Sequence, residues 1–215
     1  MPAAMPGLAH HGDMTAQAPD FVIFEGAEYA IAGVDGRGLF DPAPLSLATP
    51  MISTACWRGH IDYYTVAEGR LRLTSVALGS MATFEGRALE QGMSVAGGQV
   101  VPADRSWGAA WQITGWELAV PFTGTLLVGR DFVQETYVHM GFNPAWRFRT
   151  VWEFAVDEGV VSAALDRSDA AAAAREAILT GELADPDRAP STTSWIRRAF
   201  SLDLRRSALD DEAGR

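Results

Sequence analysis

The strongest constraint on the fold is a strand–turn–strand pattern that occurs twice in the chain. Residues 57–78 contain two runs rich in aromatic and β-branched residues, separated by turn residues 67–70. Residues 147–165 repeat this arrangement around a turn at 157–159. Glycine in each turn supplies the positive φ that tight hairpins require. Each stretch is therefore predicted to form a β-hairpin, and a duplicated hairpin would explain their similarity.

Further short strands are expected between the two hairpins, at 107–113, 116–122 and 124–128. Glycine interrupts such runs about every ten residues, which is typical of all-β domains. The chain is therefore predicted to be mainly β: a β-roll, sandwich or barrel of about 8–10 strands with one or two C-terminal α-helices. Residues 81–91 fit either a short helix or an irregular crossover.

Composition divides the chain into five expected segments. Residues 1–20 lack periodicity and are predicted to be a disordered leader. An alanine-rich stretch with Ser168 or Asp169 as N-cap and Gly181 near its end is predicted to be a helix that packs on the domain. The remaining boundaries give a β-rich domain at 21–166, the helix at 167–184, a linker at 185–191, and an amphipathic helix with a frayed tail at 192–215.

Charge and cysteine content exclude several classes of function. All 17 basic residues are Arg, against 27 acidic residues, so the net charge is −10. Nucleic-acid binding is not expected because it needs a basic surface, and the absence of Lys excludes a Schiff-base or P-loop lysine. Cys56 is the single cysteine, which excludes an internal disulfide and a multi-cysteine zinc site.

The expected location is the cytoplasm. No run of about 18 apolar residues indicates a transmembrane helix. The first basic residue is Arg37, and no continuous apolar segment precedes it, so a secretory signal peptide is not expected. Met14 is an alternative start to Met1.

The densest polar and aromatic cluster lies at residues 54–60. Side chains alternate along a strand, so one face would carry Cys56, Arg58, His60 and Asp62, with Trp57 on the other. Such a face is either solvated or the lining of a cleft. A second cluster spans residues 137–147, where Tyr137 and His139 would share a face and Asn143 begins a turn.

Two sequence blocks in these clusters resemble a family of bacterial proteins with no established activity. They are Thr-Ala-Cys-Trp-Arg-Gly at 54–59 and Tyr-Val-His-Met-Gly-Phe at 137–142. The resemblance covers roughly residues 21–166 and implies no mechanism. It implies that the family motif includes Trp57, Arg58, Gly59, His139 and Gly141. His60 departs from it, since an aromatic residue is expected there.

These clusters predict one ligand site built from Trp57, Arg58, Tyr137, His139 and Asn143. The Arg58 guanidinium would bind an anionic group, the aromatic rings would give contact area, and His139 would form a hydrogen bond. A transition-metal site is not expected, because no closely spaced ligand motif accompanies His60 and His139. No cofactor is indicated.

The C-terminal segment suggests a second surface. Its apolar residues fall on one face of a helix and lie beside several arginines. The candidate partner-binding residues are Trp195, Ile196, Arg197, Arg198 and Phe200. Such a helix either binds a protein partner or a second copy, or packs on its own sheet. A membrane role is not expected because the apolar face is short.

The sequence thus predicts a binding or interaction protein of unknown ligand. One alternative is a small enzyme in which His139 is the general acid or base, Arg58 binds an anion, and Asp62 or Glu153 is a second carboxylate. Another is a structural or assembly component. An enzyme would place Arg58 and His139 in one closed pocket, whereas an interaction protein would expose a shallow aromatic patch.

Overall fold

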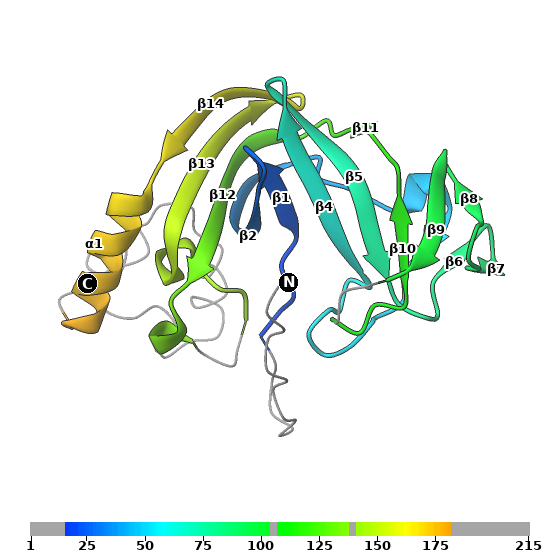
Figure 1. Cartoon of the computed structure of the whole chain (residues 1–215), viewed down its shortest axis with the longest axis horizontal. Coiled ribbons are helices and arrows are strands. Elements are labelled where there is room, and N and C mark those ends of the chain that lie inside the picture. Colours follow the sequence, from blue (N-terminus) through cyan, green and yellow to red (C-terminus); the bar gives the residue numbers. More distant parts are fainter. Residues whose placement is uncertain (1–15, 104–106, 138–140, 182–215) are drawn as a thin grey trace, which may run out of the picture.

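The computed structural model describes residues 16–103, 107–137 and 141–181. The fold is mainly β, as predicted, with seven strands closing into a barrel (Figure 1). Their order around the barrel is β14-β13-β12-β2-β1-β4-β5, and β5 meets β14 again. The bounds are β1 (Phe21–Phe24), β2 (Ala27–Arg37), β4 (His60–Ala67), β5 (Arg70–Leu78), β12 (Thr123–Phe132), β13 (Phe148–Asp157) and β14 (Val160–Asp166).

Both predicted hairpins form part of the barrel wall. They are β4–β5 and β13–β14, and each turns at a Glu-Gly pair, Glu68-Gly69 in the first and Glu158-Gly159 in the second. Neighbouring barrel strands are antiparallel, except that β1 runs parallel to β4. The barrel closes where Val160 pairs with Arg70, so the two hairpins meet beside their turns.

Shorter strands extend the sheet beyond β5. The path continues through β10 (Trp111–Thr114), β9 (Gly98–Pro102) and β8 (Ser94–Val95), and β11 (Leu118–Ala119) also pairs with β5. The strand predicted at 116–122 is therefore too long. Residues 81–91 hold two short strands rather than a helix, in a separate sheet of β3 (Leu47–Ala48), β6 (Thr83–Phe84) and β7 (Arg87–Ala88).

Apolar side chains pack on both sides of the barrel wall. The main cluster is centred on residues such as Tyr64, Phe122 and Phe154, which are completely buried. Burial of each such side chain favours folding by about 1.5–3 kcal/mol. A second cluster lies between the wall and the C-terminal helix, and a third, around Ile61 and Tyr63, lies on the other face of β4.

The C-terminal helix α1 (Ser168–Leu179) lies beside β13 and the short turn η3 (Ala145–Arg147). Arg175 donates to the carbonyl oxygens of Trp146 and Phe148, at 2.7 and 3.0 Å. Neither predicted side-chain N-cap forms, because the cap position is Arg167 and the Ser168 hydroxyl accepts the Val151 N–H instead. Among the described residues, no helix is long and apolar enough to span a membrane.

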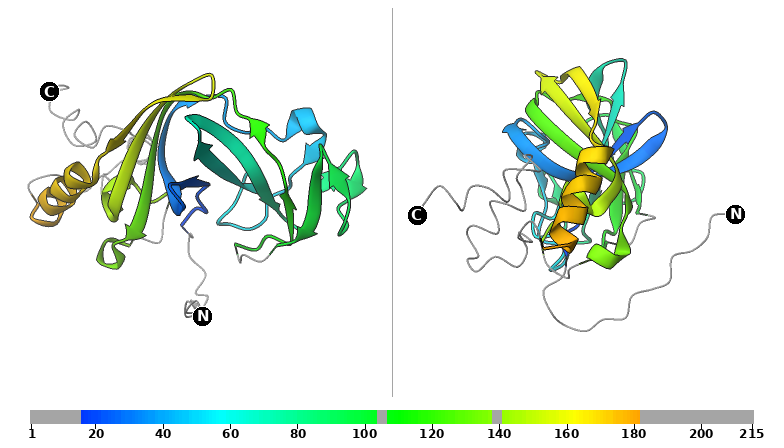
Figure 2. Two further views of the ribbon diagram at one scale, coloured as in Figure 1. Left: turned by 45° about the horizontal axis from the view of Figure 1, so that its top comes forward. Right: turned by 90° about the vertical axis from the view of Figure 1, so that its left-hand side faces the viewer.

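The packed part of the chain includes residues assigned to the leader by sequence. Residues 16–20, hereafter the N-terminal strap, run into β1 along the barrel (Figure 2). Ala18 and Asp20 are buried, and the Ala18 N–H donates to the Ala55 carbonyl oxygen at 2.7 Å. The boundary at residue 21 is therefore wrong, because tertiary contacts hold a segment that has no periodicity of its own.

The two hairpin turns provide a matched test of barrel closure. A Cβ at Gly159 would lie 2.3 Å from the Val120 carbonyl oxygen, whereas a Cβ at Gly69 would meet nothing within 4 Å. Both glycines have positive φ, so Gly69→Ala should cost about 1–2 kcal/mol of unfolding free energy. Gly159→Ala should cost about 3 kcal/mol or more, because the backbone must also shift. Urea unfolding measures both, and equal losses would contradict this account.

Candidate functional site

The N-terminal strap connects the two clusters that the sequence singled out. The Gln17 N–H donates to the Gly141 carbonyl oxygen at 2.8 Å. The Gln17 side chain donates to the Thr54 carbonyl oxygen at 2.9 Å. Thr54 of the first block and Gly141 of the second therefore both contact this one short segment. No sequence signal marked this segment, because its backbone and side-chain contacts are with residues that are distant in sequence.

The first cluster is a tight turn rather than a strand. Cys56 donates its N–H to the Ser53 carbonyl oxygen and accepts from the Ile52 N–H. Gly59 then adopts a φ of +80°, with no room for a Cβ beside the Thr49 carbonyl oxygen. The predicted common face is therefore wrong for Cys56, although His60 and Asp62 do share one face of β4. Cys56 packs with Ile61, on the face of β4 opposite His60.

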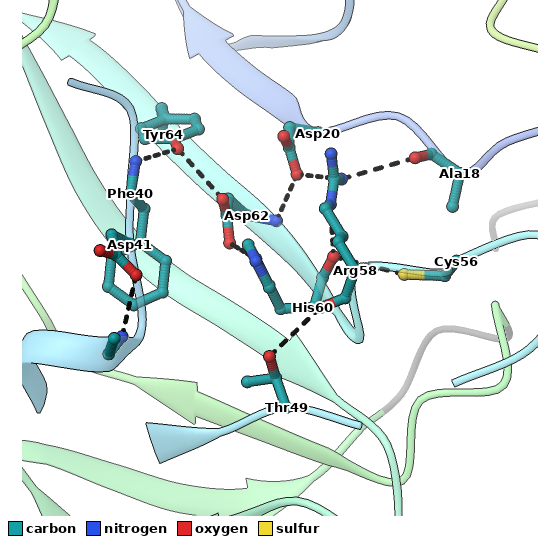
Figure 3. Close-up of polar contacts among 11 residues, drawn as sticks. Ala18, Asp20, Phe40, Asp41, Thr49, Cys56, Arg58, His60, Asp62 and Tyr64 are labelled. Carbon is teal, nitrogen blue, oxygen red and sulfur yellow. Dashed lines mark hydrogen bonds and ion pairs between the residues drawn. The ribbon is translucent and has the colours of Figure 1, made fainter. Parts of the chain in front are cut away.

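Next to this turn, polar side chains form a network in which Asp20, His60 and Asp62 are buried and Arg58 is part-buried (Figure 3). Arg58 donates to the Asp20 carboxylate, with its Nη2 2.5 Å from Oδ1, and to the His60 carbonyl oxygen at 2.7 Å. The same Asp20 oxygen accepts the Asp62 backbone N–H at 2.7 Å. Asp20 thus ties the N-terminal strap to the turn and to the first residues of β4.

The network continues along the inner face of β4. The Asp62 carboxylate lies 2.8 Å from His60 Nδ1 and accepts the Tyr64 hydroxyl at 3.1 Å. The Tyr64 oxygen in turn accepts the Phe40 N–H at 3.1 Å, and the Phe40 ring meets the His60 ring edge-on. His60 and Asp62 are both buried, so the cluster is neither a solvated face nor an open anion site.

Burial shifts the acid–base behaviour of three of these groups. Desolvation, with the nearby Asp62 carboxylate, raises the pKa of Asp20 to about 7 despite the opposing Arg58 charge. Burial also raises the pKa of Tyr64 well above its usual value and raises the pKa of the Cys56 thiol. The thiol therefore stays protonated, and Cys56 lacks the properties of a nucleophile.

The predicted ligand residues have separate partners in the structure. Arg58 is engaged by Asp20, which leaves its predicted role as an anion-binding group without support. The Tyr137 ring packs edge-on against Phe132. The Asn143 side chain accepts a hydrogen bond from the buried Arg147 at 3.2 Å. His139 lies outside the described residues, so its place relative to Arg58 stays a prediction.

Trp57 belongs to a different kind of surface. Three loops meet around the Ile52 side chain, which approaches Gly79 and Gly108 closely enough that a Cβ there would lie 3.2 and 3.1 Å away. These loops, residues 49–57, 79–83 and 107–110, are called the tip surface and contain no Asp, Glu or Arg. Their exposed large side chains are Met51, Trp57, Met81 and Trp107, at 52%, 68%, 69% and 38% exposure.

Sequence reasoning found only Trp57 among these four residues. The common signal of the three loops is their lack of charge, which is visible only once the fold shows that they are neighbours. Within residues 16–103, 107–137 and 141–181, no three or more His, Cys, Asp or Glu side chains gather as metal ligands would. The five candidate partner-binding residues from Trp195 to Phe200 lie outside the described residues.

Comparison with known proteins gave no match to a family model, a curated protein or a solved structure. The resemblance of the two sequence blocks to a bacterial family therefore stays a prediction. The site has to be interpreted from its own chemistry, a buried charged network beneath an exposed, uncharged surface.

The raised pKa of Asp20 predicts a pH-dependent contribution to stability. Folding moves this pKa from 3.8 to about 7, so the folded state binds the extra proton in this range. The contribution of Asp20 to stability should therefore fall as the pH rises from about 4 to about 7. Relative to Asp20→Asn, the unfolding free energy of the wild type should decline faster, by at most about 1.4 kcal/mol per pH unit.

Urea titrations of the two proteins across this range measure the difference. The comparison uses only the slope of the unfolding free energy against pH. Asp20→Asn also removes the ion pair with Arg58, and this loss changes the unfolding free energy itself. Parallel curves for the two proteins would show that the folded Asp20 carboxyl keeps its ordinary pKa.

Proposed function

We propose that this chain is a binding protein that recognises a protein partner through its tip surface. The observation that carries the proposal is the Trp57 side chain, which is 68% exposed on a hydrogen-bonded loop. Tryptophan anchors of this kind dominate the energy of many protein interfaces. An exposed aromatic patch is also what distinguishes an interaction protein from an enzyme with a closed pocket.

The tip surface is suited to being covered. The Trp57 indole N–H already donates to the Thr54 carbonyl oxygen at 2.8 Å. A partner can therefore cover the ring without leaving a buried hydrogen-bond donor unsatisfied. The loops contain no charged side chain that would have to lose its water. Met51 and Met81 add flexible side chains that adapt to irregular surfaces.

The charged network supports this surface from beneath. Arg58 follows Trp57 directly, and its pairing with the buried Asp20 carboxylate fixes the end of the turn. The Thr49 hydroxyl donates to the Arg58 carbonyl oxygen at 3.2 Å, which joins the beginning of the same loop to its end. A loop held in this way loses little conformational entropy on binding.

An enzyme is the second candidate, and one observation favours it. An oxygen of the Asp62 carboxylate lies 2.8 Å from His60 Nδ1. Such a contact orients an imidazole so that its other nitrogen, Nε2, can act as a general base. His60 is only 8% exposed, however, and Arg58 is paired with Asp20. The binding role has more support, because Trp57 is 68% exposed whereas His60 is buried.

Replacing Trp57 tests the proposed binding role. The partner is first identified by affinity purification from the source cells with the wild type, and its affinity is then measured by calorimetry with purified proteins. Trp57→Ala should weaken the complex by about 30-fold or more, the loss expected for an anchor residue. Leu165→Ala is the control, because Leu165 is 46% exposed on β14, outside the tip surface.

Only a protein that binds the wild type and the control but not Trp57→Ala supports the proposal. A partner that binds all three equally would place the binding surface elsewhere. Recovery of the same chain as the partner would favour the assembly role, and turnover of a co-purified small molecule would favour the enzyme.

A further inference from the structure

The N-terminal strap holds one loop of the tip surface in place. The Gln17 side chain donates to the Thr54 carbonyl oxygen at 2.9 Å. One residue later, the Ala18 N–H donates to the Ala55 carbonyl oxygen at 2.7 Å. Both acceptors lie in the loop that ends at Trp57. The position of this loop therefore depends on contacts with a segment that precedes the barrel.

Little apolar area holds the strap itself. Its five residues include two buried side chains, those of Ala18 and Asp20, and only the first is apolar. Hydrogen bonds and the ion pair between Asp20 and Arg58 supply further contacts. A segment with few buried apolar side chains opens at a lower free energy than strands packed in a core. The strap can therefore separate from the barrel while the barrel stays folded.

The closed strap encloses more negative than positive charge. The Asp20 and Asp62 carboxylates lie beside one guanidinium, that of Arg58 (Figure 3). The titratable groups that face the Asp20 carboxylate are Arg58 from the turn, His60 and Asp62 from β4, and the neutral Cys56 thiol and Tyr64 hydroxyl. With the imidazole neutral and both carboxylates ionised, one negative charge is left over. Burying that charge costs free energy, and a proton on Asp20 removes the cost.

Opening of the strap exposes the Asp20 carboxyl to water. In the closed strap, burial and the Asp62 charge raise its pKa from 3.8 to about 7. Between these two values the closed strap keeps a proton that the open strap gives to water. The equilibrium constant for opening should therefore rise with pH across this range, by at most about tenfold per pH unit. Above this range it should level off.

We propose that the N-terminal strap is a proton-controlled latch on the tip surface, which opens without unfolding of the barrel and then frees the loop at 49–57. Acid keeps the strap closed, because the protonated Asp20 carboxyl is buried at less cost. A partner that needs Trp57 held in place therefore binds the closed strap. This regulatory consequence rests on the proposed function, whereas the opening itself can be tested without a partner.

Hydrogen exchange at single backbone amides of the full-length chain tests the opening. The protection factor is the intrinsic exchange rate divided by the measured rate, and NMR determines it between about pH 5 and 7. The Ala18 N–H reports on the strap. The Gly159 N–H, which donates to the Phe122 carbonyl oxygen at 2.9 Å, reports on the barrel. The Ala18 protection factor should fall as the pH rises, by at most about tenfold per pH unit.

Low concentrations of urea distinguish local opening from unfolding of the barrel. Local opening exposes little surface, so the Ala18 protection factor should stay below that of Gly159 and change little with urea. The Gly159 protection factor should fall as urea is added. Asp20→Asn is the control for the proton, and in this variant the Ala18 protection factor should not depend on pH. The same pH dependence in both proteins would show that Asp20 does not carry the proton.

Either of two results in the wild type would overturn the latch. Equal protection factors at Ala18 and Gly159, with the same response to urea, would show that the strap leaves only when the barrel unfolds. An Ala18 protection factor that does not change with pH would show that opening releases no proton. Both results are independent of whether the Asp20→Asn variant folds.

The partner identified with the wild type tests the regulatory consequence. If it binds only the closed strap, it should raise the Ala18 protection factor about tenfold at a concentration about nine times its Kd. An unchanged protection factor in the complex would show that the strap does not control the tip surface, although the proposed function would stand. Equal binding of the wild type and Trp57→Ala would instead refute the proposed function and leave the opening of the strap untouched.

Discussion

One buried carboxylate, that of Asp20, joins the N-terminal strap to residues 38 and 42 positions later in the chain. It accepts hydrogen bonds from the Arg58 side chain and the Asp62 backbone, and so links the N-terminal strap, the 54–59 turn and β4. The arrangement places the two buried carboxylates of Asp20 and Asp62 close to the Arg58 guanidinium, whose side chain is 32% exposed. Removing one member of such a group leaves a charge buried without compensation, which is far more costly than losing a surface ion pair. The conformation of this end of the barrel depends on that constraint.

The site separates charge from exposure in an unusual way. Asp20 and Asp62 are buried, whereas Trp57 and Met81 are exposed on loops without charge. Ordinary surfaces have the opposite distribution. The ion pair between Arg58 and Asp20 holds the end of the loop at 49–57, and the large exposed side chains of the tip surface are apolar. The recognition that we propose for this surface would therefore rely on shape and apolar area rather than on the anion binding predicted for Arg58.

The parts of the fold that the sequence predicted well depend on local interactions. The β4–β5 and β13–β14 hairpins were predictable because a Glu-Gly turn between two strand-forming runs specifies its own geometry. The prediction of a strand through residues 54–59 failed, because the positive φ of Gly59 interrupts the alternation of side chains between two faces. The prediction that residues 16–20 belong to a disordered leader failed, because their order comes from contacts with residues such as Ala55 and Gly141, which are distant in sequence.

The sequence by itself determined a mainly β domain with two hairpins and a following helix, and it identified Trp57 as a candidate contact residue. It did so because strand alternation, turn chemistry and helix propensity act over a few residues. Only the tertiary structure decided that Arg58 forms an ion pair with Asp20, that Cys56 and His60 lie on opposite faces, and that three uncharged loops form one surface. These outcomes depend on which distant segments become neighbours, a choice made by packing the whole barrel and not by any local pattern.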